Sequence, residues 1–407
     1  MKKFPDNFYW GAATASYQVE GGIDNCDWAM AALEGRVPHC DKACDHYNRF
    51  EEDFDIAKSL GHTAHRFSVE WARIEPEEGK FDINEIEHYR AVLLALKARG
   101  IKPFITIWHF TVPIWFSETG GFERKDSPAI FARYCAFVAH QLGDLCEHFS
   151  TMNEPNVYGS NGWLRGSWPP FKRFSLTDAV SITNSGRTHE ASADRSLKNI
   201  FVYLKVMKNL AKAHNEAYRT IKSILPNIEV SVVKHVIVFD SVDSFFFRLK
   251  AKLANYFWTY KFMDRVKDKC DSIGLNYYFY TKFGDKTVWK KTDMDWNFAP
   301  DHIYDALMML KRYNKPMFVS ECVIADHDDS DRAEYIKKQV EGVWRAIRDG
   351  ADVRGHLYWS LLDNYEWALG FEKRFGLVEV NYDTLERKIR PSAFVYKTII
   401  ENNEVLE

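Results

Sequence analysis

Two glutamates, Glu154 and Glu321, each end an apolar run that is typical of a buried strand. Acidic residues at the ends of two strands that lie far apart in the chain predict a pair of carboxyl groups in one pocket. Hydrolysis of a glycosidic bond needs such a pair, because one group protonates the departing oxygen while the other attacks the anomeric carbon or activates a water. Cleavage of a glycosidic bond is therefore the first hypothesis for this chain.

Helical and strand patterns alternate along the sequence. In the clearest case, apolar residues at helical spacing over 86–96 are followed by Gly100 and then by the apolar run 101–108. The same order recurs where helical patterns over 131–142 and 336–347 precede further short apolar runs. This alternation is typical of βα units.

Eight candidate strands can be collected in this way, and they predict an α/β protein with the (β/α)8 architecture of a TIM barrel. A doubly wound open sheet would usually carry a glycine-rich phosphate turn after its first strand, and none is visible. No linker marks a second domain, so residues 1–407 are predicted to form a single barrel domain, with a Ser, Thr and Asn-rich loop over 175–196 near its mouth. The predicted strands are residues 8–15, 63–69, 104–108, 148–153, 228–239, 272–278, 317–321 and 355–361.

Charge and cysteine content narrow the possible partners and the compartment. The chain has 54 basic and 57 acidic residues, which predicts neither a nucleic acid partner nor a membrane partner. Charged residues interrupt the apolar stretch 236–258, and Pro5 and Asp6 interrupt a potential signal sequence. Seven scattered cysteines suit reduced thiols, so a cytoplasmic protein is expected.

Polar and aromatic residues gather at the ends of the other predicted strands. In a barrel, chemistry takes place at the carboxyl ends of the strands, where both glutamates are also expected. Any one of these side chains has an ordinary structural explanation, such as a core ion pair or a buried imidazole, and only their common position suggests a site. They are Gln18, Arg66, His109, Asn276, Tyr278 and Trp359.

Five segments of the chain have a distinctive combination of aromatic and polar residues. They are residues 8–21 (FYWGAATASYQVEG), 65–74 (HRFSVEWARI), 151–155 (TMNEP), 274–278 (GLNYY) and 359–367 (WSLLDNYEW). In these segments the chain resembles glycoside hydrolase family 1, the β-glycosidases, and the resemblance extends nearly from end to end. It implies a retaining β-glycosidase of the β-glucosidase type that hydrolyses O-glycosyl bonds and needs no metal or cofactor.

The resemblance also implies a division of labour between the two glutamates. Glu154 matches the general acid/base and Glu321 matches the nucleophile, while Arg66 and Tyr278 match the residues beside the nucleophile. The nucleophile must stay ionised, which a neighbouring cation favours. Glu154 must be protonated at rest, so burial and the charge on Glu321 are expected to raise its pKa.

By the same residue matching, further side chains resemble the residues that bind the glycone, the terminal sugar, in this family. Trp359 resembles the aromatic platform under that sugar. Asn153 would hold the 2-hydroxyl. Family members that cleave 6-phosphoglycosides resemble one another in a small hydroxyl residue at position 366, with a lysine and a tyrosine downstream, where this chain has Glu366, Lys373 and Phe375. Because a carboxylate would repel a 6-phosphate, an unphosphorylated glucoside, galactoside or fucoside with an aryl or alkyl aglycone is expected rather than a 6-phospho-β-glycoside. The matched set is Gln18, His109, Asn153, Glu366 and Trp367.

Other hypotheses remain open at this point. The family usually has Asn-Gly after the nucleophile, whereas Cys322 and Val323 follow Glu321 here, and valine disfavours a positive φ. A sugar-binding barrel with little or no catalysis is therefore the second hypothesis. An aldolase or isomerase barrel would need a lysine or a metal cluster at the strand ends, and we identify neither. The nearby His39, Cys40, Cys44 and His46 match no strong zinc spacing, and the sequence makes no prediction of oligomeric state.

Overall fold

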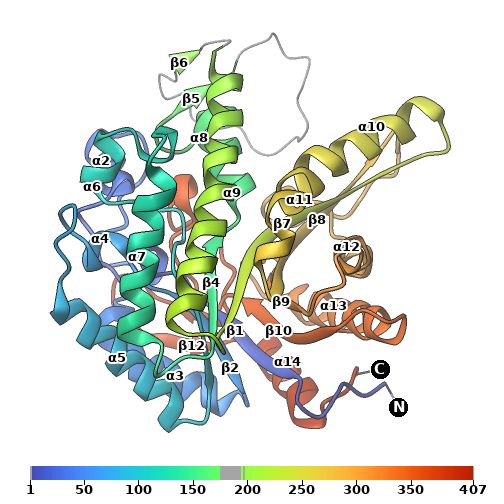
Figure 1. The fold of residues 1–407 in the computed structure, drawn as a ribbon. Helices are drawn as coiled ribbons and strands as arrows, with labels where there is room; N and C mark the ends of the chain where they lie inside the picture. The colour runs from blue at the N-terminus through green and yellow to red at the C-terminus, as the bar shows by residue number, and fades with distance from the viewer. Residues whose placement is uncertain (1, 175–193, 196–197, 407) are drawn as a thin grey trace.

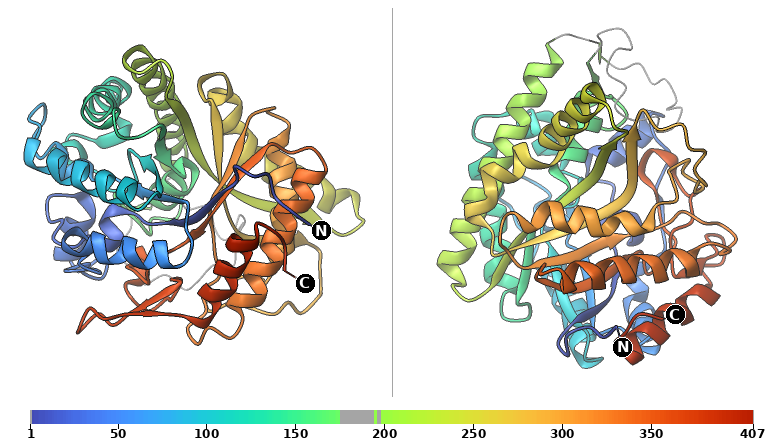
Figure 2. Two further views of the ribbon diagram at one scale, coloured as in Figure 1. Left: turned by 90° about the horizontal axis from the view of Figure 1, so that it is seen from below. Right: turned by 90° about the vertical axis from the view of Figure 1, so that its right-hand side faces the viewer.

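The computed structural model describes residues 2–174, 194–195 and 198–406, so most of the predicted loop over 175–196 lies outside the described residues. The chain forms a closed barrel of parallel strands in the order β1-β10-β9-β8-β7-β4-β3-β2. Seen along the barrel in Figure 2, the strands form a ring that helices surround. The prediction of a TIM barrel is confirmed.

All eight predicted strands are present in the barrel. β7 and β8 extend beyond their predicted ends because they continue to pair with each other outside the barrel, from Val238 opposite Tyr280 to Ser241 opposite Phe283. The barrel strands are β1 (Tyr9–Ala13), β2 (Ala64–Ser68), β3 (Lys102–Thr106), β4 (His148–Asn153), β7 (Glu229–Ser241), β8 (Ser272–Phe283), β9 (Met317–Cys322) and β10 (Val353–Trp359). The short strands are β5 (Lys172–Arg173), β6 (Asp194–Arg195), β11 (Val378–Val380) and β12 (Arg387–Ile389).

Helices cover the outside of the barrel (Figure 1). The three helical patterns in the sequence correspond to α5, α7 and α13, and the Asp82 carboxylate caps α5 by accepting from the backbone N of Asn84 at 2.8 Å. The helices are α1 (Ser16–Val19), α2 (Asp27–Leu33), α3 (His46–Ser59), α4 (Trp71–Ile74), α5 (Ile83–Ala98), α6 (Ile114–Glu118), α7 (Ser127–Leu142), α8 (Pro155–Trp163), α9 (Asn199–Ile224), α10 (Phe245–Asn255), α11 (Lys261–Val266), α12 (Ile303–Lys311), α13 (Arg332–Arg348) and α14 (Pro391–Asn402).

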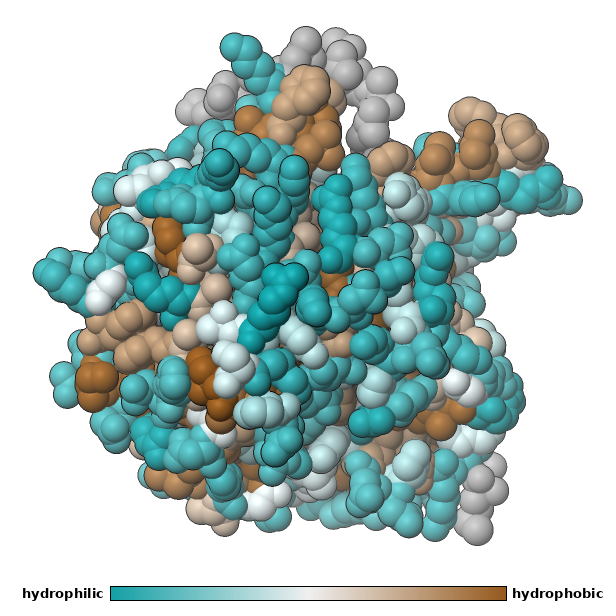
Figure 3. Space-filling model, in the orientation of Figure 1, coloured by the Kyte–Doolittle hydropathy of each residue, from teal (hydrophilic) through white to brown (hydrophobic). Residues whose placement is uncertain are grey.

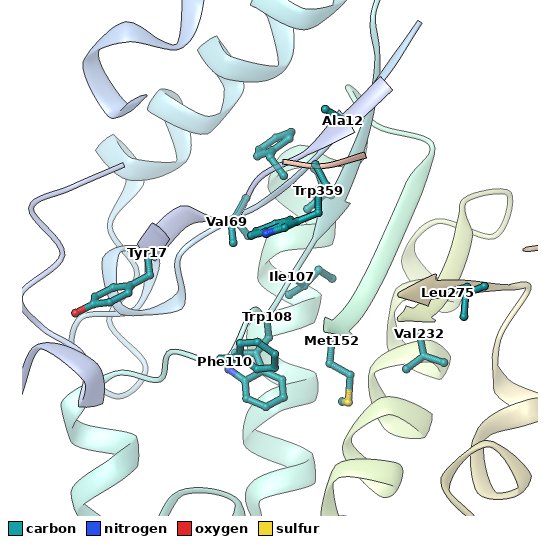
Figure 4. Close-up of a cluster of buried hydrophobic side chains, with 14 of the residues drawn as sticks. Ala12, Tyr17, Val69, Ile107, Trp108, Phe110, Met152, Val232, Leu275 and Trp359 are labelled. Atoms are coloured by element: carbon teal, nitrogen blue, oxygen red, sulfur yellow. The ribbon is translucent and has the colours of Figure 1, made fainter. Parts of the chain in front are cut away.

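The buried core lies between the barrel and its helices. Figure 4 shows part of it, where Ile107, Met152, Val232 and Leu275 come from successive strands or the turns that follow them. The two ends of the chain meet on the outside, because the backbone N of Phe4 donates to the carbonyl oxygen of Asn403 at 3.0 Å. The same ends lie side by side in both views of Figure 2.

A buried ion pair holds the segment that follows β10. The Asp363 carboxylate is fully buried and accepts from Nη1 and Nη2 of Arg390 at 3.0 and 2.8 Å. Replacement of Arg390 by methionine would leave the carboxylate without its bidentate partner, so we expect the free energy of unfolding to fall by about 3–5 kcal/mol. Urea denaturation at pH 7 measures this loss.

The matched control is Arg90→Met, because Arg90 makes the same kind of bidentate pair with Asp144 at 2.7 Å on the surface. That pair is solvated, so we expect a loss below about 1 kcal/mol. Equal losses in the two variants would contradict a structural role for the buried pair.

Candidate active site

A cavity of about 470 Å³ opens at the carboxyl ends of the barrel strands. This is the size range of small-molecule sites in proteins. Most of the predicted site residues line it, and the two exceptions, Arg66 and Asn276, lie behind the wall and hydrogen-bond to residues that do. The predicted residues in the wall are Gln18, His109, Asn153, Glu154, Tyr278, Glu321, Trp359, Glu366 and Trp367.

Glu321 lies near the end of β9 and is held from two sides. Arg66 of β2 donates to one carboxylate oxygen, and the Tyr278 hydroxyl of β8 donates to the other. Arg66 is itself fixed, because its Nε donates to Thr106 Oγ1 at 2.7 Å and its Nη2 donates to Asn153 Oδ1 at 2.7 Å. A guanidinium and a phenol together stabilise the ionised carboxylate.

Tyr278 is suited to remain a hydrogen-bond donor. Burial, and then the charge on Glu321, raise the pKa of its phenol well above the usual value. The phenol therefore stays protonated at neutral pH, so its O–H can donate a hydrogen bond to the Glu321 carboxylate.

Glu154 has different surroundings. Burial and then the charge on Glu321 raise the pKa of its carboxyl well above the usual range. Its direct side-chain donor is a neutral amide, since Asn276 Nδ2 donates to Oε1 at 2.7 Å. The two carboxyl groups thus have different surroundings, because burial raises the pKa of Glu154 whereas Glu321 accepts from a guanidinium and a phenol.

The backbone at Glu154 is fixed in a conformation that is uncommon for glutamate. Its φ of 40° lies in the left-handed region, where α8 begins directly at Pro155. The backbone N donates to the carbonyl oxygen of Val233 in β7 at 3.0 Å, which holds the turn in place. Phe110 and Trp367 also have positive φ, and both line the cavity. Such strain is common at sites where the surrounding structure must aim a side chain.

Asparagine side chains link the two glutamates. Asn276 accepts from Ser320 Oγ at 2.7 Å, and its amide nitrogen lies 3.2 Å from Asn153 Oδ1 as well as close to Glu154. Asn153 in turn accepts from Arg66, the cation beside Glu321. One hydrogen-bond network therefore fixes both carboxyl groups relative to each other.

Several atoms in the cavity wall are suited to a sugar. Gln18 donates through Nε2 to the carbonyl oxygen of Tyr365 at 2.6 Å, whereas its Oε1 and Nδ1 of His109 have no hydrogen-bond partner among the described residues. The His109 ring lies nearly parallel to the rings of Trp359 and Trp367, with centroids 5.9 and 6.0 Å apart. Polar atoms beside aromatic faces suit the hydroxyls and C–H faces of a pyranose.

Glu366 is also part of this wall. Burial, and then the nearby charge on Glu321, raise the pKa of Glu366 to about 8. Lys373 and Phe375 line the cavity with it, and Lys373 Nζ donates to the carbonyl oxygen of Asp293 at 3.0 Å. The wall therefore combines a carboxyl group, an ammonium group and an apolar ring.

The unusual residues after Glu321 cause no backbone strain. Neither Cys322 nor Val323 has a positive φ, and both side chains are buried. Cys322 Sγ lies 3.0 Å from Nε2 of His356, which gives the thiol a polar partner. Glu321 keeps both of its donors despite the departure in sequence.

Three of the four residues considered as metal ligands have other partners. Cys40 and Cys44 donate to the carbonyl oxygens of Tyr17 and Asp363, and Nδ1 of His46 lies 2.7 Å from the Asp53 carboxylate. Within residues 2–174 and 198–406, no group of three or more potential ligands is arranged to hold a metal ion.

The structure adds residues that sequence reasoning missed. One of them is a lysine within the fifth barrel strand, β7. Lys234 is fully buried behind the cavity wall, where its Nζ donates to the carbonyl oxygen of His235 at 2.7 Å and lies 5.6 Å from the Trp258 ring. Its position within an apolar run was the available signal. Burial lowers the pKa of its ammonium group well below the usual value, and its charged form would lower the pKa of Glu154.

The outer part of the cavity is aromatic, and no sequence pattern identified it. Trp168, Trp258, Phe279 and Trp296 line it, and all come from loops or elements outside the matched segments. These rings meet only through the fold, because a long stretch of sequence separates Trp168 from the others.

Comparisons with known proteins identify the family of this chain. The family model for glycosyl hydrolase family 1 matches residues 1–283 and 249–405. The chain is 30% identical to a 1,4-beta-D-glucan glucohydrolase of Thermotoga neapolitana, over 99% of both proteins. The structure of a β-glycosidase from Pyrococcus horikoshii matches with a TM-score of 0.88 and 35% identity, over 100% of this chain and 96% of that one. A 6-phospho-beta-galactosidase of Staphylococcus haemolyticus is 26% identical over the full length of both.

The chain therefore belongs to glycosyl hydrolase family 1. It is a glycoside hydrolase built on a (β/α)8 barrel.

Proposed function

We propose that the protein is a retaining exo-β-glycosidase that hydrolyses terminal, unphosphorylated β-D-glycosides, with glucosides as the first choice and galactosides or fucosides as further substrates. The observation that carries the proposal is the unequal environment of the two glutamates. Glu321 accepts from a guanidinium and a phenol, whereas Glu154 is buried beside a neutral amide. One group is prepared to attack and the other to give a proton.

The reaction follows from these roles in two displacements. In the first, a Glu321 oxygen attacks the anomeric carbon, the bond to the aglycone oxygen breaks, and the Glu154 proton passes to that oxygen. In the second, water attacks the anomeric carbon, its proton passes to Glu154, and the bond to Glu321 breaks. Two inversions at one carbon retain the β configuration.

The same geometry explains how one carboxyl group serves in both steps. Charge on Glu321 raises the pKa of Glu154 in the free enzyme. Once Glu321 is bonded to the sugar, that charge is gone, so the pKa of Glu154 falls and the group becomes the base that the second step needs. When the bond to the sugar breaks, Glu321 becomes an anion again, and Tyr278 and Arg66 stabilise it through their hydrogen bonds.

Glu366 supports the choice of an unphosphorylated sugar. A 6-phosphate in the cavity would meet this carboxyl group, which ionises as the pH rises through about 8, together with the apolar ring of Phe375. The named glucohydrolase relative supports a glucoside as the first substrate to test. A 6-phospho-β-glycoside remains the alternative, for which the Staphylococcus relative is the precedent.

A sugar-binding barrel without catalysis is less consistent with the site. That hypothesis rested on Cys322 and Val323, and their ordinary backbone leaves Glu321 between Arg66 and Tyr278. Catalysis requires two carboxyl groups whose surroundings favour different protonation states, whereas sugar binding alone does not.

The proposal is tested with a 2-deoxy-2-fluoro-β-glucoside carrying a good leaving group. The fluorine slows both steps, and the activated leaving group allows the first, so we expect a glycosyl-enzyme to accumulate and peptide mapping to find the label on Glu321. A parallel panel of aryl β-glycosides, with and without a 6-phosphate, measures kcat/KM for each sugar.

At a pH above about 8, where Glu366 is ionised, we expect the unphosphorylated glucoside to exceed its 6-phosphate by at least about 10²-fold in kcat/KM, because the buried carboxylate repels the phosphate. A label on another residue would overturn the assignment of the nucleophile. Preference for the 6-phosphate would overturn the proposed substrate. Binding of glucosides without any turnover would favour the sugar-binding barrel.

A further inference from the structure

The end of the arm formed by β7, β8 and α10 carries a large apolar surface. In Figure 1 the arm projects from the barrel, and in Figure 3 hydrophobic side chains gather on its upper side. Phe245 and Phe246 are 77% and 67% exposed, and adjoining apolar side chains with such exposure are uncommon on the surface of a monomeric protein. We call this surface the α10 patch, and its members are Phe245, Phe246, Leu249, Leu253, Tyr256 and Phe257.

The α10 patch occupies one continuous face of the helix. At about 100° per residue, the four members in α10, which are Phe245, Phe246, Leu249 and Leu253, fall within about one third of the helix circumference. Tyr256 and Phe257 follow in the π-helical turn Tyr256–Tyr260, which continues α10 directly. The opposite face packs against the extended strands, because buried Ala251 and half-buried Trp258 cluster with Ile237, Phe239 and Phe279. The helix is therefore anchored by one apolar face and exposes a second.

Basic residues border the exposed face. Residues 244–261 contain four basic side chains and no acidic one. Arg248 and Lys252 fall on one flank of the α10 patch and Lys250 on the other, with Lys261 beyond its end. The immediately preceding Asp243 is exposed and pairs with Arg248.

We propose that the α10 patch docks onto an anionic lipid surface, with the helix lying in the plane of the membrane interface. Aromatic and leucine side chains would enter the boundary between headgroups and acyl chains, while the flanking lysines and arginine reach the phosphates. A second copy of the chain fits less well, because a twofold contact through this face would bring the basic flanks toward each other.

This binding is peripheral and differs from spanning the bilayer. Among the described residues, no helix combines the length and apolar character needed to cross a membrane. The near balance of charge over the whole chain predicted no membrane partner, but the local charge of residues 244–261 is strongly positive. Binding would also place the active site near the lipid, because Trp258, on the opposite face of the same helical segment, lines the cavity.

The test is cosedimentation of the full-length protein with vesicles. We expect binding to vesicles of equal parts phosphatidylcholine and phosphatidylglycerol, and binding at least about tenfold weaker to phosphatidylcholine alone. The Phe246→Ser/Phe257→Ser double variant should bind the anionic vesicles at least about tenfold more weakly, and so should Lys250→Glu/Lys252→Glu. Added salt should weaken binding of the unaltered protein.

The matched control is Phe394→Ser, which removes a half-exposed phenylalanine from α14 and should leave vesicle binding unchanged. Unchanged hydrolysis of a soluble aryl β-glucoside by all variants shows that each is folded. Failure of the unaltered protein to bind either vesicle would overturn the proposal, as would equal binding of the double variant. Sedimentation velocity tests the alternative that a second copy of the chain covers the α10 patch. A dimer that dissociates in the double variant, without vesicle binding, would identify the patch as a dimer interface.

Discussion

Replacement of Glu321 by alanine is expected to lower kcat/KM for an aryl β-glucoside by at least about 10⁴-fold. The variant lacks the oxygen that attacks the anomeric carbon, so the glycosyl-enzyme cannot form, while the cavity and the proton on Glu154 remain. Because Arg66 keeps its hydrogen bonds to Thr106 and Asn153, we expect the variant to fold. Steady-state kinetics and circular dichroism measure the two effects separately.

Azide distinguishes loss of the nucleophile from general damage. A small anion can occupy the space left by the Glu321 side chain and attack the sugar from the same face, giving an α-glycosyl azide after a single inversion. Glu372→Ala is the matched control, because Glu372 also lines the cavity, whereas Arg66 and Tyr278 donate to Glu321. Full activity of the Glu321 variant, or restoration of activity in the control by azide, would contradict the proposed role.

The barrel could be predicted from the sequence because its signal is local. Each strand is a short apolar run, several of these runs follow a helical pattern, and eight such runs leave few architectures. The ends of β7 and β8 could not be predicted in the same way. Their outer halves are kept extended by each other's backbone, and a pairing partner distant in sequence leaves no local pattern.

The inner site could also be predicted, because its residues lie at strand ends or in segments with family resemblance. Arg66 and Glu321 lie in strands, and Glu154 directly follows one, and the closed barrel brings these strands together. Their protonation states depend instead on burial and on distances between charges, which only the folded chain defines. The sequence raised a conflict at Val323, and the structure resolves it because the backbone there needs no positive φ.

The aromatic outer part of the cavity and the α10 patch were not predicted, for opposite reasons. Trp168 and Trp258 are ordinary aromatic residues in sequence and become a common wall only when distant segments meet. The apolar face of α10 was visible as part of the stretch 236–258, where its charged residues excluded a membrane-spanning helix. Exposure, which sequence alone does not report, is what separates an interfacial face from a buried one.

Replacement of Glu154 by alanine is expected to affect substrates in proportion to their need for a proton. An aryl glycoside with a poor leaving group should lose about 10²–10⁴-fold in the first step, whereas a dinitrophenyl glycoside, whose oxygen leaves without protonation, should lose little there. The unaltered enzyme should lose activity as the pH rises through the pKa of Glu154, because the acid form is consumed. That basic limb should disappear in the variant, and a pH profile of kcat/KM measures it.

Azide then separates the roles of the two glutamates. In the Glu154 variant Glu321 still forms the glycosyl-enzyme, and azide in the space of the missing acid attacks it from the opposite face, so two inversions give a β-glycosyl azide. The Glu321 variant should give the α anomer from the same substrate. Asn276→Ala serves as the control, since it removes a donor to Glu154 but leaves the carboxyl group, and azide should form no product with it. The same anomer from both glutamate variants would contradict the assignment of Glu154 as the acid and Glu321 as the nucleophile.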